Sequence, residues 1–167
     1  MIRLQLDNRI GRKERAPDGM TWYFAYGSNL DMFQMMRRIG EWETSLRARA
    51  LGYKLLFNVR SRRWGDFAAN IQRTGNDSDV VLGVVYRISK DKLRILENYE
   101  NIRPSTIDVQ LDNGSPLVGV SVFIFGTNRA SGKPQAAYKS AILDGLKQHG
   151  FSEDDQEKVR SIMEQAG

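Results

Sequence analysis

The order of strand-like and helical segments along the chain constrains its fold more than any other feature. Runs rich in aromatic and β-branched residues predict strands over residues 21–26, 46–58, 67–72, 79–88, 105–111 and 117–126. Apolar spacing and capping residues predict helices over about residues 30–39, 90–100, 134–148 and 152–165. The strands dominate the middle of the chain, and the helices do not alternate with them as βαβ units would. This order predicts the α+β class, with a mostly antiparallel sheet that can curl into a barrel.

Short turn and cap signals set the expected boundaries. Asn113-Gly114 lies between the last two strands and is a strong hairpin signal. Gly40 is the expected stop of the first helix, whereas Ser89 and Ser152 are expected to cap the second and fourth helices. The apolar face of the first helix is predicted from its spacing to consist of Leu30, Phe33, Met36 and Ile39.

The composition is that of one globular domain and excludes several kinds of site. The chain has 167 residues, of which 41% are hydrophobic, and no apolar run is long enough for a membrane-spanning helix. Because cysteine is absent, disulfides and a cysteine nucleophile are excluded. His149 is the single histidine and cannot build a multi-histidine metal centre. We expect His149 to be a surface residue beside a helix end, no metal site, no contact with a membrane and a cytoplasmic location.

The net charge of +5 raises the question of an anionic partner. Residues 1–19 form a basic N-terminal extension that differs in pattern from the domain expected over residues 20–167. No helix-turn-helix, zinc-finger or RNA-binding signature accompanies the basic residues, so we expect no nucleic-acid partner. The expected role is a solvated basic surface, and the alternative is a funnel for an anionic substrate. The basic residues concerned are Arg3, Arg9, Arg12, Lys13 and Arg15, with a second cluster at Arg60, Arg62 and Arg63.

The loop between the first strand and the first helix is a candidate anion site. Gly27 lets the backbone turn tightly and lets a ligand approach the main chain. The amide groups of a helix's first turn have no partner inside the helix, so they favour a carboxylate or an oxyanion. Ser28 and Asn29 add short polar side chains. The alternative interpretation is a tight turn in which Ser28 or Asn29 only caps the helix.

A carboxylate on the second predicted helix is a candidate general base. At about 100° per residue, Glu100 falls between Leu93 and Leu96, whereas Glu97 lies away from the apolar sector. An inward carboxylate loses solvation, which raises its pKa toward the value that a general base needs near pH 7. The alternative is a solvated Glu100 at a frayed helix end, paired with Arg103.

These sites occur in a pattern that resembles the γ-glutamyl cyclotransferases. The run from Tyr23 to Leu30 is similar to the signature of that family, and the segment from Gly83 to Glu100 is similar to its second block. The resemblance covers about residues 21–165 and implies a small mixed β-barrel with flanking helices. It implies that Glu100 is the catalytic residue. It further implies that the substrate is bound by Tyr23, Phe24, Ala25, Tyr26, Gly27, Ser28, Asn29 and Tyr138. From the residues alone, Tyr138 is equally open to interpretation as a core aromatic on one face of its helix.

The implied reaction releases an amino acid from a γ-glutamyl compound and leaves the glutamyl group as 5-oxoproline. The substrate contains its own nucleophile and electrophile, so no cofactor is expected. Residues 101–107 depart from the family pattern because they are shorter and lack an aromatic residue. This departure leaves two alternatives, an enzyme for γ-glutamyl amines or a related metabolite, and a binding module without turnover. The assembly is left open between a monomer and a homodimer.

Overall fold

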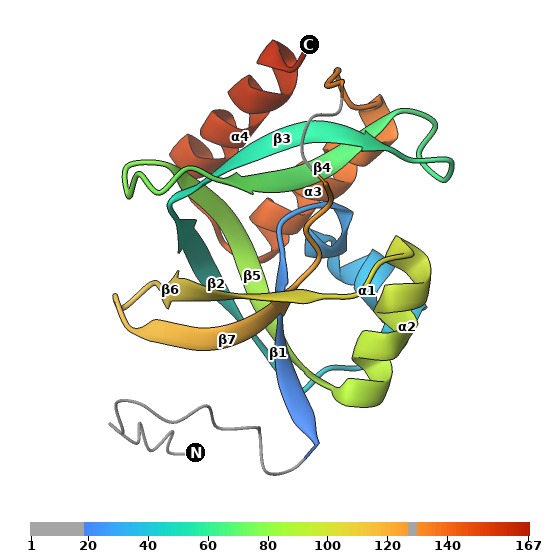
Figure 1. Cartoon of the computed structure of the whole chain (residues 1–167), viewed down its shortest axis with the longest axis vertical. Coiled ribbons are helices and arrows are strands. Elements are labelled where there is room, and N and C mark those ends of the chain that lie inside the picture. Colours follow the sequence, from blue (N-terminus) through green and yellow to red (C-terminus); the bar gives the residue numbers. More distant parts are fainter. Residues whose placement is uncertain (1–18, 127–129) are drawn as a thin grey trace.

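A computed structural model describes residues 19–126 and 130–167, and its centre is a closed β-barrel (Figure 1). The strand order around the barrel is β1-β5-β2-β6-β7. Neighbouring strands are antiparallel except β1 and β7, which run parallel and close the barrel at Tyr23 and Ser121. The strands are β1 (Met20–Ala25), β2 (Thr44–Leu51), β5 (Val80–Ser89), β6 (Ser105–Leu111) and β7 (Pro116–Val122). Of the predicted N-terminal extension, residues 1–18 lie outside the described residues.

A two-stranded hairpin lies outside the barrel, above it in Figure 1. It consists of β3 (Tyr53–Arg60) and β4 (Phe67–Arg73), paired with each other and with no barrel strand. Asn70 joins the hairpin to the chain that follows β7. Its side-chain amide donates to the Phe125 carbonyl at 3.1 Å and accepts from the Phe125 amide at 2.9 Å. The side chain of Asn70 is therefore one link between the hairpin and the chain that leaves the barrel.

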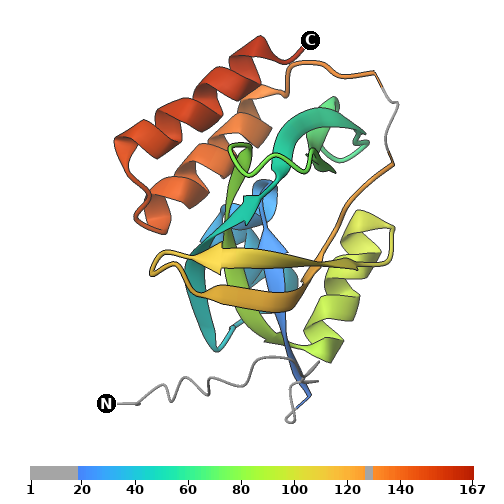
Figure 2. The same cartoon turned by 60° about the vertical axis from the view of Figure 1, so that its left-hand side comes forward.

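Helices flank the barrel and the hairpin. A short 3-10 helix η1 (Ser28–Leu30) precedes α1 (Met32–Ile39), and α2 (Lys90–Glu100) contacts α1, β1 and β5. Helices α3 (Ala136–Gln148) and α4 (Glu153–Gln165) lie side by side, as Figure 2 shows. In the part of the chain that the structure describes, no helix is both long and apolar enough to cross a membrane.

The barrel core requires glycine where β5 crosses close to β1. A Cβ added to Gly83 would lie 2.4 Å from the Ala25 carbonyl oxygen and 2.4 Å from the ring of Phe24. Phe24 and Tyr86 are fully buried side chains of these two strands. Glycine at position 83 thus allows the large aromatic residues to fill the barrel without separating its strands.

The predicted α+β barrel is confirmed, with corrections to single elements. The strand expected over residues 46–58 is wrong: Gly52 adopts φ 79°, which ends β2 and starts β3. The strand expected over 117–126 ends at Val122. The helix expected over 30–39 is divided, because the Asp31 side chain accepts a hydrogen bond from the Phe33 amide and caps α1. The expected caps at Ser89 and Ser152 and the stop at Gly40 are confirmed.

The predicted apolar face of the first helix is confirmed for Leu30 and Ile39, which are buried, and wrong for its other two residues. Phe33 and Met36 are exposed, whereas Gln34 and Met35 are buried. The physical reason is a polar network around Gln34, described below, which turns this face of α1 toward the loop that precedes it. The apolar spacing alone could not reveal a buried amide.

Candidate active site

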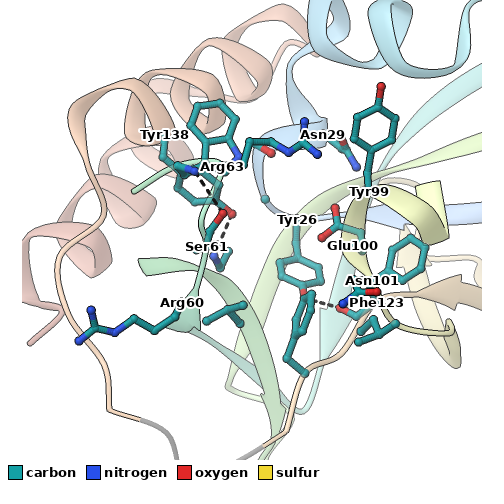
Figure 3. A pocket seen from close by; sticks show the side chains of 18 of the residues that line it. Tyr26, Asn29, Arg60, Ser61, Arg63, Tyr99, Glu100, Asn101, Phe123 and Tyr138 are labelled. Carbon is teal, nitrogen blue, oxygen red and sulfur yellow. Dashed lines mark hydrogen bonds between the residues drawn. The ribbon is translucent and has the colours of Figure 1, made fainter. Parts of the chain in front are cut away.

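A cavity of about 510 Å³ opens where the barrel, the hairpin and the helices α1, α2 and α3 meet. Figure 3 shows Tyr99, Glu100 and Asn101 on one side of this cavity, with Tyr138 and Ser61 on the other and Tyr26 between them. Tyr26 directly follows β1, Asn101 directly follows α2, and the other side chains come from α2, α3 and the turn between β3 and β4. The volume is in the range of small-molecule sites.

Most of the sequence-predicted site residues meet in this cavity. Seven of them line it: Tyr23, Tyr26, Gly27, Ser28, Asn29, Glu100 and Tyr138. Phe24 and Ala25 do not line it and are fully buried in the core. Side chains alternate across a strand, so Phe24 points to the side of β1 opposite Tyr23 and packs on Gly83. We therefore remove Phe24 and Ala25 from the predicted substrate contacts.

The loop after β1 presents amide groups at the start of η1. The first hydrogen bond of this turn runs from the Leu30 amide to the Gly27 carbonyl at 3.0 Å, and the next from Asp31 to Ser28 at 3.1 Å. The amides of Ser28 and Asn29 precede these bonds and have no partner within the turn. Both residues are buried beside the cavity. The arrangement suits a carboxylate or an oxyanion.

Tyr138 closes the cavity behind this loop. Its hydroxyl accepts a hydrogen bond from the Ala69 amide at 2.8 Å, and its ring packs edge-on against Trp64. A Cβ added to Gly27 would lie 2.8 Å from the Tyr138 hydroxyl, so glycine is needed for the close approach. Burial raises the pKa of Tyr138, although the amides of Ala69 and Ser28 lower it. Tyr138 is therefore a protonated phenol that is both packed in the core and exposed to the cavity.

A polar network fixes the side chain of Asn29. Its amide nitrogen donates to the Tyr23 hydroxyl at 3.0 Å. Its amide oxygen accepts from Gln34 and from Arg38, both at 2.9 Å. Gln34 also donates to the Ser28 hydroxyl at 2.7 Å. Asn29 thus orients Arg38, and Gln34 holds the two polar loop residues together.

Glu100 and Arg38 form an ion pair at the cavity wall. The Arg38 guanidinium lies 3.7 Å from the Glu100 carboxylate, and the two side chains are 7% and 26% exposed. Burial raises the pKa of Glu100, while the positive charges of Arg38 and Arg63 lower it. Arg103, the alternative partner expected from the sequence, is exposed and does not line the cavity. Glu97 is also outside the lining.

Sequence reasoning missed Arg38 and Gln34. They are four residues apart and share a helix face with buried Met35 and Ile39. That spacing was the available signal, since polar residues in an apolar stripe indicate a buried polar contact. It was obscured because Phe33 and Met36 offered an equally regular apolar pattern.

A basic rim surrounds the mouth of the cavity. Arg60, Arg62 and Arg63 are exposed, as the solvated-surface prediction requires, but they also line the cavity. The guanidinium of Arg63 lies 4.7 Å from the ring centre of Tyr99, and that of Arg38 lies 4.5 Å from the same ring. The geometry therefore favours the alternative of an anionic-substrate funnel for this cluster.

Residues 101–107, which differ from the family pattern, follow α2 and contribute to the edge of the cavity. Asn101 ends the helix with a left-handed backbone (φ 57°), and Asn101 and Ile102 both line the cavity. Ile102 is partly buried against the core. The short segment thus supplies an amide and an aliphatic side chain at this edge.

His149 supports the loop from behind, in contrast to the surface position that we expected. It is half-buried at the end of α3, with its Nε2 atom 3.0 Å from the Tyr86 hydroxyl and 3.1 Å from the Leu30 carbonyl oxygen. The Tyr86 hydroxyl donates to the Asn29 carbonyl at 3.0 Å. A proton on Nε2 therefore satisfies the Leu30 carbonyl, and burial lowers the pKa of the ring.

Within the described residues, no group of three or more histidine, aspartate and glutamate side chains is arranged to hold a metal ion. The polar side chains of the cavity are instead one carboxylate, four guanidiniums, four phenols, and the hydroxyls and carboxamides of two serines and two asparagines. Such a set can bind anions and transfer a proton.

Comparisons with known proteins identify the family of the chain. The family model for γ-glutamyl cyclotransferase, AIG2-like, matches residues 23–144. The γ-glutamylcyclotransferase of Mus musculus is 32% identical over 150 residues, which cover 84% of this chain and 77% of the mouse protein. The γ-glutamylcyclotransferase of Homo sapiens is 31% identical over 150 residues, with the same shares of the two chains.

Solved structures give the same result at the level of the fold. A structure described as γ-glutamyl cyclotransferase has a TM-score of 0.77 at 28% identity, covering 86% of this chain and 88% of that chain. A yeast γ-glutamyl cyclotransferase specific to glutathione has a TM-score of 0.65 at 12% identity, covering 88% and 95%, and shares the fold alone. The matched segment contains the loop, Glu100 and Tyr138 in one cavity. The chain therefore belongs to the γ-glutamyl cyclotransferase, AIG2-like family and is an enzyme of the γ-glutamylcyclotransferase type.

Proposed function

We propose that the enzyme closes the γ-glutamyl group of its substrate into 5-oxoproline, with Glu100 as the group that moves the protons. The observation that carries this proposal is the position of Glu100. It is the one carboxylate among the described residues that line the cavity, and it lines the same space as Ser28 and Asn29 of η1. Its pKa is raised by burial, as a general base near neutral pH requires.

The reaction needs one new bond and one broken bond. The α-amine of the glutamyl group attacks its own γ-carbonyl carbon, and the bond from that carbon to the leaving nitrogen breaks. Glu100 takes a proton from the α-ammonium group, which frees the nitrogen lone pair for attack. Glu100 then delivers that proton to the leaving nitrogen as its bond to the carbonyl carbon breaks. The attacking nitrogen still carries one hydrogen more than the ring amide keeps, and this second proton passes to the released amine, which leaves as an ammonium group, so the carboxylate is regenerated. No outside reactant enters this balance.

The loop and Tyr138 supply the opposite side of the site in this proposal. The amide of Asn29, next to the Ser28 amide that interacts with the Tyr138 hydroxyl, holds the substrate α-carboxylate or stabilises the oxyanion that forms on the γ-carbonyl oxygen. The Tyr138 oxygen accepts from the Ala69 amide, so its own proton is free to donate to an oxygen in the cavity. Together these groups hold the glutamyl chain in the folded shape that ring closure needs, an orientation effect worth several kcal/mol.

Arg38 has a positioning role in this scheme. Its charge opposes the effect of burial on the pKa of Glu100 and so keeps a fraction of the carboxylate ionised. Its hydrogen bond to Asn29 connects the carboxylate side of the cavity to the loop side. The distance between the two sides is thereby fixed before the substrate binds.

The decisive experiment replaces Glu100 by glutamine. The Glu100→Gln variant should fold and lose turnover by about 10²–10⁴-fold, because it cannot accept a proton. The measurement is 5-oxoproline released from γ-glutamyl dipeptides, with ligand affinity followed separately. Glu97→Gln is the matched control on the same helix and should keep most of its rate. Turnover of Glu100→Gln close to that of the control would remove Glu100 from this role.

Two other functions were open from the sequence, and the same assay separates them. Product from γ-glutamyl amines alone would indicate the amine-specific enzyme, the alternative left open by the departure in residues 101–107. Binding of a γ-glutamyl compound without any 5-oxoproline would indicate a binding module. The presence of Glu100 in the cavity favours turnover.

The cytoplasmic location, the absence of a nucleic-acid partner and the homodimer remain predictions from the sequence. Light scattering of the purified chain measures the assembly. Salt-dependent binding to nucleic acid would contradict the second prediction.

A further inference from the structure

The wall of the cavity has a surplus of positive charge. Four arginines line it, Arg38, Arg60, Arg62 and Arg63, and Glu100 is the one carboxylate among the described residues of the lining. The γ-glutamyl half of a substrate cannot use this surplus, because its α-ammonium and α-carboxylate charges cancel. The complementary negative charge must therefore lie on the leaving group.

The four arginines differ in how available their guanidinium groups are to bind a substrate carboxylate. Arg38 is buried and already paired with Glu100. The guanidinium of Arg60 lies 4.9 Å from the ring centre of Phe67 and is directed away from the cavity in Figure 3. Arg62 and Arg63 are the exposed arginines of the turn between β3 and β4.

Arg63 reaches across the mouth of the cavity. Figure 3 shows its side chain extending toward Tyr99, and the guanidinium lies 4.7 Å from that ring centre. Among residues 19–126 and 130–167, no carboxylate forms an ion pair with Arg62 or Arg63. An aromatic face on a half-exposed residue is a weak partner for a guanidinium, and a carboxylate bound by two parallel hydrogen bonds is a stronger one.

The position of Arg63 relative to Glu100 decides what it can contact. Tyr99 directly precedes Glu100, and the charge of Arg63 is close enough to lower the pKa of Glu100. In the proposed function, on which this inference rests, the leaving nitrogen receives its proton from Glu100 while the glutamyl part occupies the loop. The remainder of the leaving group then extends toward the mouth of the cavity, where Arg62 and Arg63 lie.

We propose that Arg63, with Arg62 beside it, selects γ-glutamyl compounds whose leaving group carries two carboxylates. One guanidinium is sufficient for the α-carboxylate of a leaving amino acid, and the second accommodates an acidic side chain. The preferred substrate class is thus a γ-glutamyl acidic amino acid, and a γ-glutamyl amine without any carboxylate is the poorest substrate. Arg63 is a specificity-determining residue and takes no part in proton transfer.

An isosteric pair of substrates tests this inference. γ-Glutamyl-aspartate and γ-glutamyl-asparagine have nearly the same shape and differ by one negative charge. We expect a preference for the aspartate compound of about three- to tenfold in kcat/KM, since an exposed ion pair contributes on this scale. The preference should lie mainly in KM, because the contact exists before the chemical step. It should decrease as the salt concentration rises.

The Arg63→Gln variant should reduce this ratio to near one. Arg94→Gln is the matched control, because Arg94 is exposed, is paired with Asp91 and does not line the cavity; it should keep the wild-type ratio. Equal kcat/KM values for the two compounds in the wild type, or an undiminished ratio in Arg63→Gln, would overturn the inference and leave the proposed function intact. Failure to form 5-oxoproline from every γ-glutamyl compound would instead overturn the proposed function, and this inference with it.

Discussion

Arg38 illustrates how much a single residue contributes to the proton chemistry of this site. Its guanidinium contacts Glu100 and Asn29, and it also lies over the ring of Tyr99. Burial disfavours the charged form of both members of the pair, and the charge of each offsets part of that effect on the other. Removing the cation leaves a carboxylate that is still poorly solvated.

We predict that Arg38→Gln shifts the acid limb of the kcat/KM profile to higher pH. The positive charge of Arg38 lowers the pKa of Glu100, so its loss raises that pKa, and less of the base is ionised at a given pH. Relative to an Arg37→Gln control on the exposed side of α1, the rate should fall by roughly tenfold at pH 6 and by less at pH 8. The same proportional loss at both pH values would show that Arg38 acts only in binding.

For single residues, the sequence predicted that the Glu100 side chain points inward, but it did not predict which residue pairs with it. The helical position of Glu100 between Leu93 and Leu96 was enough to direct it inward. Its partner could not be found that way, because Arg38 belongs to another helix and pairing between helices depends on the barrel. The exposure of Phe33 shows the same limit, since no local pattern reveals that the Gln34 side chain is buried by its hydrogen bond to Ser28 in the loop.

Among the elements, η1 depends on support from the end of α3. His149 donates to the Leu30 carbonyl, and Tyr86 donates to the Asn29 carbonyl, so the carbonyl side of the loop is held by two side chains. The end of α3 and a barrel strand thus hold the loop that lines the cavity. The loop geometry is a product of tertiary contacts more than of its own sequence.

We predict that His149→Ala lowers the free energy of unfolding by about 1 kcal/mol at pH 8, the usual value of one hydrogen bond. The pKa of His149 is lowered in the folded chain, so protonation favours the unfolded chain. The histidine's contribution is therefore complete above its unfolded pKa of about 6.5 and is lost as the pH falls through the folded value. The difference between wild type and variant should shrink below pH 6.

Urea unfolding at pH 5, 6, 7 and 8 measures this difference, with Lys147→Ala as the control at the exposed neighbouring position. A difference that stays constant over the whole series would mean that His149 acts only by packing.

Element boundaries were predictable where one residue determines them. Ser152 accepts from the Asp155 amide and starts α4, as a capping serine should. The division of residues 46–58 into β2 and β3 was not predictable from strand propensity, because both halves favour strands equally. Gly52 was the available signal, and its positive φ decides the division.

For the whole molecule, barrel closure depends on tight contacts between β1 and β5. We predict that Gly83→Ala lowers the free energy of unfolding by about 1–3 kcal/mol, because the added methyl group would overlap the Ala25 carbonyl and the Phe24 ring. Chemical denaturation measures this loss. Gly114→Asn is the control, since no atom lies within 4 Å of a Cβ there and asparagine tolerates its backbone conformation. Equal stability of the two variants would contradict the prediction.

The barrel architecture itself could be predicted from the order of segments, whereas the separate sheet of β3 and β4 could not. The sequence shows which runs are strands but not which of them pair, and residues 53–60 look no different from barrel strands. Pairing is decided by the packing of the complete molecule, including the contact between Asn70 and Phe125.

Because the hairpin is a separate sheet, the residues of the β3–β4 turn can change without a change in the barrel side of the site. Glu100 and the amides of η1 belong to the barrel side, while the turn that bears Arg62 and Arg63 interrupts no barrel strand. A change in the length or charge of residues 61–66 would therefore alter which compound the enzyme accepts without altering how the ring is closed. Relatives with different substrates would be expected to diverge first in this turn.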